Sequence, residues 1–124
     1  MDWRIQLILT LLERDICRTP PCRELAEKAN LSYSRLSHLF KSQTGCSLSK
    51  YIRRVRMRKA AVLLESTFLS VKQTMVAVGI NDLSHFVRDF KRASGHTPTE
   101  YRKLHLEKSR INQSLTVPIA KSAN

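Results

Sequence analysis

Residues 25–45 read LAEKANLSYSRLSHLFKSQTG, and the last six residues of this stretch recur fifty positions later in the chain. FKSQTG at 40–45 becomes FKRASG at 90–95, with the phenylalanine, the lysine and the glycine kept. The upstream correspondences are Leu36 with Phe86, Ser34 with Ser84, and Ala29-Asn30-Leu31 with Val78-Gly79-Ile80. The last of these has an offset of 49, so the second copy holds one extra residue in its turn.

Each copy has the pattern of a short helix, a tight turn and a second helix. In the first copy Ser32 is a good N-cap residue and Gly45 is suited to end the helix that follows. In the second copy Asp82 and Gly95 stand at the corresponding positions. This is the organisation of a helix-turn-helix unit, whose second helix can enter the major groove of DNA.

Apolar residues recur at helical spacing in the rest of the chain, and no alternating strand pattern persists. The sequence therefore predicts an all-α fold: two helix-turn-helix subdomains, homeodomain-like lobes, joined by a long linker helix, with about seven helices in all. The expected helices cover residues 3–16, 21–29, 33–43, 47 or 49 to 65, 71–78, 83–93 and about 98–104. The expected domains are a first lobe at 1–46, a linker helix at 47–66, a second lobe at 67–104 and a polar, disordered tail at 105–124.

The charge of the chain favours a polyanionic partner. The 124 residues include 22 lysines and arginines but only 10 acids, which gives a net charge of +12. Between Glu27 and Glu65 there is no acid, although this stretch holds nine cationic residues. A solvated helix face is the alternative, but such faces usually mix both signs of charge. We therefore expect this stretch to lie against nucleic acid.

Other classes of protein are disfavoured. Cys17, Cys22 and Cys46 form no CxxC or Cys/His quartet, so we expect no structural metal, no cofactor, and reduced thiols in a cytoplasmic protein. The first four residues carry an acid and no cleavage site, unlike a signal peptide. The longest apolar run, Leu7–Leu12, is too short to span a membrane.

Three stretches resemble the DNA-binding domain of AraC/XylS-type bacterial transcription regulators. They are LAEKANLSYSRLSHLFKSQTG (25–45), YIRRVRMRKAAVLL (51–64) and VGINDLSHFVRDFKRASGHTPTEYR (78–102). The resemblance covers about residues 4–104. It implies two helix-turn-helix lobes on a rigid helix, whose two reading helices enter successive major-groove segments on one face of the DNA.

The resemblance also implies which side chains contact bases: Ser34, Ser37, His38, Ser84 and Arg88. Helical geometry adds Arg35 and His85, which are expected on the same exposed faces. Arg88 is the strongest candidate because a guanidinium can donate to both O6 and N7 of guanine. Its alternative role is a salt bridge with Asp82 or Asp89. The alternative for both histidines is a plain surface or capping role.

A second set of cations is expected to contact phosphates, which positions a protein on DNA without reading sequence. These residues are Lys41, Lys50, Arg53, Lys91 and Arg92. Arg56 matches an arginine of the family that is structural, so we expect no base contact from it.

Two features depart from the family pattern. Thr74 and Met75 stand where a large aliphatic residue and an alanine are preferred, so Met75 either pushes two helices apart or swings aside. Cys22 stands where a hydroxyl cap is preferred, and Thr19 is expected to replace it.

Together these features predict a sequence-specific double-stranded DNA-binding transcription regulator, an activator rather than an enzyme. We expect a monomer that binds a non-palindromic promoter site, contacts RNA polymerase and resides at the nucleoid. No sensor domain is recognised, so the chain is expected to be either a stand-alone regulator or the C-terminal domain of one that a sensor dimerises.

The main alternative is a basic protein that binds nucleic acid without sequence preference. RNA binding is disfavoured because aromatic stacking platforms are absent from the sequence. A hydrolase built on Cys46 and His38 is disfavoured because no third group is suited to orient the pair.

Overall fold

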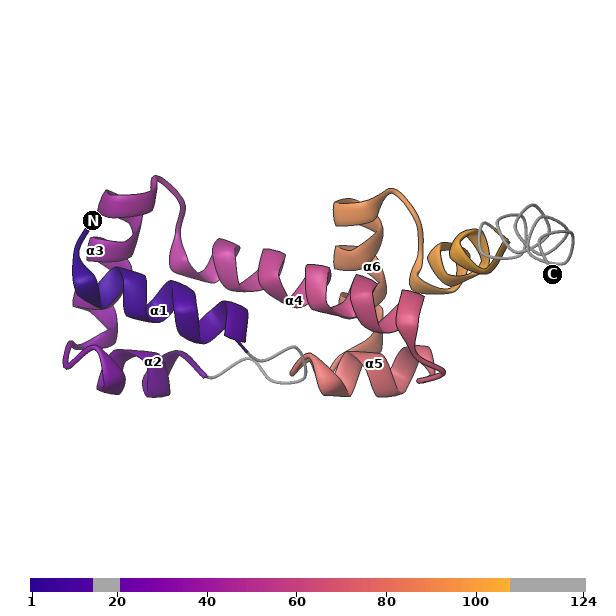
Figure 1. The fold of residues 1–124 in the computed structure, drawn as a ribbon, viewed down its shortest axis with the longest axis horizontal. Coiled ribbons are helices and arrows are strands. Elements are labelled where there is room, and N and C mark those ends of the chain that lie inside the picture. Colours follow the sequence, from indigo (N-terminus) through magenta and orange to yellow (C-terminus); the bar gives the residue numbers. More distant parts are fainter. Residues whose placement is uncertain (15–20, 108–124) are drawn as a thin grey trace, which may run out of the picture.

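The computed structural model describes residues 1–14 and 21–107, and every regular element within these residues is a helix (Figure 1). The helices are α1 (Trp3–Arg14), α2 (Cys22–Lys28), α3 (Tyr33–Thr44), α4 (Leu48–Ser66), α5 (Val71–Ala77), α6 (Leu83–Ser94) and a last helix over 98–107. The predicted all-α fold is therefore confirmed. The last helix runs three residues beyond the expected boundary at 104. The predictions for Cys17, for Thr19 and for the tail beyond 107 lie outside the described residues.

Side-chain caps fix the start of α3 and α6, the reading helices of the first and the second lobe. The Ser32 hydroxyl accepts a hydrogen bond from the backbone N–H of Arg35 at 3.2 Å, and the Asp82 carboxylate accepts one from His85 at 2.9 Å. Both helices end at a left-handed glycine, Gly45 with φ 77° and Gly95 with φ 86°. A residue with a side chain rarely adopts this conformation, which explains the glycine at both positions.

Among the described residues, no side chain caps the start of α2. Pro21 occupies the N-cap position, and no side chain there accepts a hydrogen bond from the helix. The fixed backbone angle of proline still suits this position at the beginning of a helix.

Two separate hydrophobic cores hold the two lobes, and α4 contributes to both. Leu48, Ile52 and Val55 pack into the first core with α1, α2 and α3. The later residues of α4 pack into the second core with α5 and α6: Met57, Ala60, Leu63 and Leu64. One continuous helix therefore serves as the last helix of the first lobe and the first helix of the second.

A tyrosine closes each lobe in the same way. The Tyr51 ring lies edge-on to Phe40 with centroids 5.4 Å apart, and its hydroxyl donates to the Glu13 carboxylate at 3.0 Å. Tyr101 lies edge-on to Phe90 at 5.3 Å. The repeat seen in the sequence therefore continues past the glycine that ends each reading helix.

The residues after α6 also fasten the C-terminal end of α4. Tyr101 donates a hydrogen bond to Glu65, and its burial, assisted by this carboxylate, raises the pKa of Tyr101 to about 12. Arg102 donates to the backbone carbonyls of Leu64 and Thr67 at 3.2 and 3.3 Å. A cation at this end of a helix is favoured by the helix dipole.

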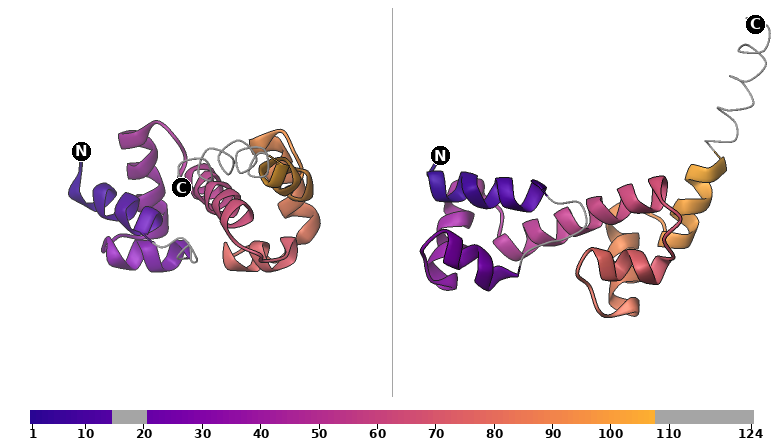
Figure 2. Two further views of the ribbon diagram at one scale, coloured as in Figure 1. Left: turned by 45° about the vertical axis from the view of Figure 1, so that its right-hand side comes forward. Right: turned by 60° about the horizontal axis from the view of Figure 1, so that its bottom comes forward.

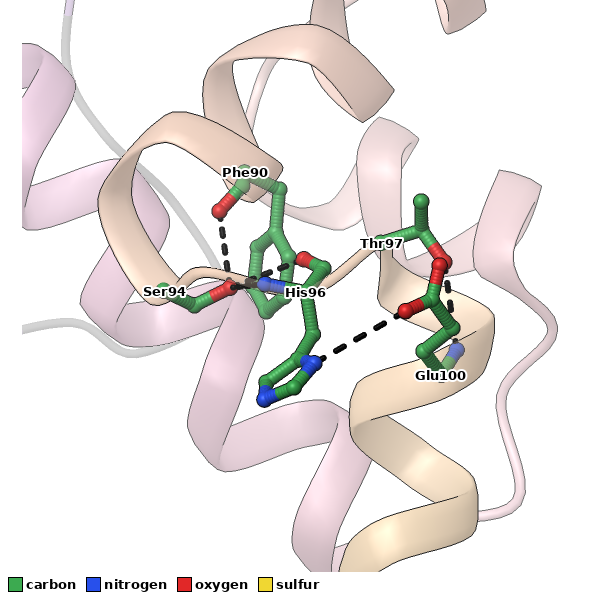
Figure 3. Close-up of polar contacts among 5 residues, drawn as sticks. All are labelled: Phe90, Ser94, His96, Thr97 and Glu100. Atoms are coloured by element: carbon green, nitrogen blue, oxygen red, sulfur yellow. Dashed lines mark hydrogen bonds and ion pairs between the residues drawn. The ribbon is translucent and has the colours of Figure 1, made fainter.

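A hydroxyl at the end of each reading helix shapes the turn that follows, and Figure 3 shows this turn in the second lobe. The Ser94 oxygen lies 2.8 Å from the carbonyl oxygen of Phe90, and it accepts a hydrogen bond from the N–H of His96 at 3.2 Å. The His96 ring lies 3.7 Å from the Glu100 carboxylate in the next helix. Thr44 makes the matching bonds in the first lobe. Both turns therefore lead the chain from a reading helix into the helix behind it.

Met75 is accommodated inside the second core. Its side chain is 4% exposed and packs with Val78, Phe86 and Phe90, so it fills space between α5 and α6 and leaves them in contact. Thr74 is fully buried, and its hydroxyl has no hydrogen-bond partner among the described residues. The second lobe thus retains its fold with an unusual pair of core residues.

The two lobes lie at opposite ends of α4 and have the same orientation. In Figure 1, α1 and α4 both run from left to right, while α3 and α6 both run from bottom to top. The views in Figure 2 keep the lobes side by side along α4. The second lobe is therefore a copy of the first that is displaced along the linker helix.

Candidate nucleic-acid interface

The reading helix of the first lobe, α3, has one buried face and one exposed face. Leu36 and Phe40 are fully buried in the first core. The opposite face carries polar and cationic side chains that are exposed: Ser34, Arg35, His38 and Lys41. This separation follows from helical spacing, because residues four apart lie on the same side of the helix.

Ser37 does not belong to this exposed face, so the expected exposure of Ser37 is wrong. The residue is half-buried, and its hydroxyl oxygen is covered without a hydrogen-bond partner among the described residues. Its counterpart in the second lobe, Val87, is also half-buried. The position lies on the flank of the helix, one residue after the buried Leu36, rather than on its outer side.

Two grooves run beside α3, and Ser34 and His38 line both. The first groove has a volume of about 360 Å³ and also holds Arg4 and Arg35. The second has a volume of about 590 Å³ and also holds Lys41. Ser34 and His38 thus form the outer ridge of the reading helix.

The second reading helix, α6, repeats this arrangement. Phe86 and Phe90 are buried, whereas five polar or cationic side chains are exposed on the rest of the helix: Ser84, His85, Arg88, Lys91 and Arg92. From 32 to 50 and from 82 to 100, equivalent positions are buried, half-buried or exposed alike. The two helices therefore present the same geometry with different side chains.

Arg88 has no ion pair with either carboxylate considered as its alternative partner, within the described residues. Asp82 accepts the capping hydrogen bond of α6. Asp89 is 12% exposed and lies 3.9 Å from the guanidinium of Arg53. Because both carboxylates have other partners, Arg88 is left exposed and available for an external anion.

The cations of α4 divide into exposed and inward-facing residues. Lys50 and Arg54 are exposed, while Arg53 faces Asp89 with 51% of its side chain still accessible. Arg56 is half-buried, and its guanidinium packs against the turn of the second lobe at Gly79. Arg56 therefore has a structural position, as the resemblance implied.

His85 lies in a cleft between the lobes rather than on the outer ridge of α6. This cleft has a volume of about 320 Å³ and is also lined by Arg53, Arg56, Gly79 and Asp89. Helical spacing alone missed this placement because it reports only the exposed side of α6, not the neighbouring lobe.

Arg4 is a cation near the interface that sequence reasoning missed. It lies in α1, lines the groove beside α3, and donates hydrogen bonds to the Asp2 carboxylate at 3.1 and 2.9 Å. These bonds lower the pKa of Asp2 to about 2. No sequence signal links residue 4 to α3, since only the packing of α1 brings them together.

Within residues 1–14 and 21–107, no group of three or more His, Cys, Asp or Glu side chains is arranged to hold a metal ion. None of the described helices combines the length and hydropathy needed to cross a bilayer.

Comparison with known proteins identifies the family. A family model described as a helix-turn-helix domain matches residues 25–104. The Msm operon regulatory protein of Streptococcus mutans is 38% identical over 80 residues, which are 64% of this chain and 29% of that protein. The transcriptional activator RhaR of Mannheimia succiniciproducens is 27% identical over 85% of this chain and 38% of its own length. The chain thus spans well under half the length of these relatives.

Solved structures agree with this assignment. The C-terminal domain of the response regulator yesN from Fusobacterium nucleatum has a TM-score of 0.71 and 31% identity, over 82% of this chain and 99% of that one. An AraC-type transcriptional regulator from Chromobacterium violaceum has a TM-score of 0.71 and 27% identity, over 82% and 91% of the two chains. This chain belongs to the helix-turn-helix family of AraC-type DNA-binding domains, which are parts of transcription regulators.

Proposed function

We propose that this protein binds double-stranded DNA in a sequence-specific manner through both reading helices at once, and thereby regulates transcription. The observation that carries the proposal is the equivalent exposure of α3 and α6, which run in the same direction at the two ends of α4 (Figure 1). Two helices that run in the same direction at the two ends of one continuous helix can enter two successive major-groove segments, which are about 34 Å apart along B-form DNA.

Six of the expected base-contacting residues retain this role in the proposal. They are Ser34, Arg35, His38, Ser84, His85 and Arg88, all of which are exposed. Ser37 is left out because its hydroxyl is covered. Among them Arg88 contributes most to discrimination, since its unpaired guanidinium can donate two hydrogen bonds to one guanine.

The phosphate contacts are assigned to exposed cations beside the reading helices: Lys41, Lys50, Lys91 and Arg92. Arg53 joins them through the exposed part of its side chain, while Asp89 holds its guanidinium towards the second lobe. These contacts attract and position the DNA but do not distinguish one sequence from another.

Two reading helices in one chain remove the need for a symmetric dimer. The proposed complex is therefore a monomer on a non-palindromic promoter site that spans about two helical turns. We further propose that the bound protein activates transcription by contacting RNA polymerase, in the cytoplasm at the nucleoid, and that it catalyses no reaction. The activator RhaR among its relatives supports activation rather than repression.

Selection of bound sequences from a pool of random duplexes tests this function. The expected result is one enriched, non-palindromic motif with two conserved segments, and competition by the selected duplex at far lower concentration than by random DNA. Equal competition by both duplexes contradicts the proposal and favours a basic protein that coats nucleic acid without preference.

A further inference from the structure

The two reading helices differ most usefully at one pair of equivalent positions, His38 and Arg88. Each lies six residues after the capping residue of its helix, on the exposed ridge. The buried residues two positions before and after are Leu36 and Phe40 for His38, and Phe86 and Phe90 for Arg88. Neither side chain has a hydrogen-bond or ion-pair partner among the described residues, so both are free to contact DNA. The first lobe thus presents an imidazole where the second presents a guanidinium.

Among the described residues, the two grooves beside His38 are lined by cations and by no carboxylate. Arg4 and Arg35 share the first groove with His38, and Lys41 shares the second. The remaining residues that line these grooves are neutral apart from the titratable Tyr33 phenol. Asp2, the acid next to Arg4, accepts two hydrogen bonds from the guanidinium of that arginine. The residues that line these grooves therefore offer no counter-charge to a protonated His38, and a bound polyanion supplies one.

DNA supplies acceptors at this place. In the major groove guanine offers only acceptors, N7 and O6, and phosphates line the groove on both sides. A neutral imidazole can offer these acceptors only one N–H donor, because its other nitrogen is itself an acceptor and cannot bond to them. A protonated imidazole has two N–H donors and a positive charge. Histidine is the side chain whose charge changes between about pH 5 and 8.

We propose that His38 reads the first half-site in its protonated form, so that its contact with DNA is linked to proton uptake, whereas Arg88 at the equivalent position of the second lobe makes its contact without taking up a proton. The proposal rests on the proposed function, because it assumes that α3 enters the major groove. It predicts a regulator whose affinity for the first half-site rises as the pH falls.

Thermodynamic linkage sets the size of the effect. Reading in the protonated form means that at most one proton is taken up at His38 when the DNA binds. The dissociation constant then rises by at most about tenfold for each unit of pH increase. Arginine stays protonated throughout this range, so Arg88 contributes no such slope.

The test measures the dissociation constant of the whole chain for the selected duplex from pH 5.5 to 7.5, at constant ionic strength. The variants are His38→Arg, which fixes the charge, and His105→Gln, which removes a histidine that pairs with Glu65 away from the reading helices. We expect the wild type and His105→Gln to weaken several-fold for each unit of pH increase. We expect His38→Arg to bind well with a clearly smaller slope.

Two results overturn the proposal: a wild-type affinity that does not change with pH, or a slope that is the same in His38→Arg as in the wild type. A residual slope in His38→Arg reports His85 and leaves the assignment of His38 intact. Failure of the proposed function gives a different result. In that case neither the wild type nor either variant prefers the selected duplex over random DNA at any pH, and this also overturns the proposal for His38.

Discussion

The first and second lobes share their construction but differ in the side chains that they expose. Both have a capped reading helix, a left-handed glycine at its end, and a tyrosine packed edge-on against a core phenylalanine. Their outer ridges differ, with Ser34 and His38 in one lobe and Ser84 and Arg88 in the other. The comparison shows that the repeated residues maintain the geometry of the helix, while the exposed residues between them differ, and in the proposed function these residues set which bases are read.

The cores differ as well, and this difference shows what the fold tolerates. The position occupied by Ala26 in the first lobe is occupied by Met75 in the second, and both residues are buried. Methionine is unbranched and flexible, so it can fill an irregular space without separating the helices around it. The lobes thus reach the same shape with different core volumes.

The largest effect is expected from emptying one core. Phe90→Ala should lower the free energy of unfolding by about 3–5 kcal/mol, because it removes a buried aromatic ring that packs against Tyr101. Phe40→Ala is the matched variant in the first lobe. Urea denaturation measures the loss, and hydrogen exchange locates it. Loss of protection confined to α5 and α6 in Phe90→Ala is the expected pattern, whereas equal loss in α1 to α3 contradicts the view that the cores are separate.

A smaller effect on binding is expected from Arg88→Ala. It should weaken binding to the selected duplex by about 1–3 kcal/mol and relax the preference at one base pair of the second half-site. Lys91→Ala, one turn further along α6, is the control and should weaken all duplexes alike. Binding assays on duplexes changed at single base pairs distinguish these outcomes. A uniform loss in Arg88→Ala refutes its assignment as a base-reading residue.

A gain of stability is expected in the second lobe from Thr74→Val. This change replaces a buried hydroxyl that has no described partner with a methyl group of similar shape, so the free energy of unfolding should rise by about 1 kcal/mol. The control is Thr67→Val, since the Thr67 hydroxyl donates to the carbonyl of Leu63 and its removal should destabilise. Thermal denaturation measures both. Destabilisation by Thr74→Val implies that the hydroxyl has a partner in solution.

The linker helix offers a test of phosphate contact. Lys50→Ala should reduce the slope of log affinity against log salt concentration by about one unit, and it should leave the sequence preference intact. Lys72→Ala, an exposed lysine of α5 without an assigned contact, should leave the slope unchanged. A new sequence preference in Lys50→Ala contradicts its role as a positioning residue.

The tyrosine of the second lobe predicts a modest loss of stability in alkali. The pKa of Tyr101 is raised from 10.0 to about 12 in the folded protein, so the folded state holds this proton more tightly than the unfolded state. Stability that is fully present below pH 10 is therefore lost between about pH 10 and 12. Thermal denaturation of Tyr101→Phe should show a flatter pH dependence in this window than the wild type. An identical dependence in both proteins rules out this contribution.

The sequence predicted the features that depend on local spacing. The repeat, the caps at Ser32 and Asp82, and the ends at Gly45 and Gly95 all belong to single helices, and the structure confirms them. The exposed faces of α3 and α6 followed from the same spacing. Ser37 is the exception, because helical spacing predicted an exposed side chain and the residue lies half-buried on the flank of α3.

The features that sequence reasoning missed depend on contacts between distant elements. Arg53 meets Asp89 only because the packing of α6 on α4 brings the two side chains together, and Arg102 reaches the end of α4 only after the chain has passed through α5 and α6. A single sequence gives no signal for such contacts between distant residues. They join the second lobe to the linker helix in addition to the shared hydrophobic core.

The central claim, that α3 and α6 read one face of the DNA together, is tested most directly by changing the spacing of the two half-sites. Inserting about five base pairs between them turns the second half-site to the opposite side of the duplex. The account predicts that affinity then falls to that of a duplex with only one half-site intact. Unchanged affinity for the lengthened duplex would contradict it.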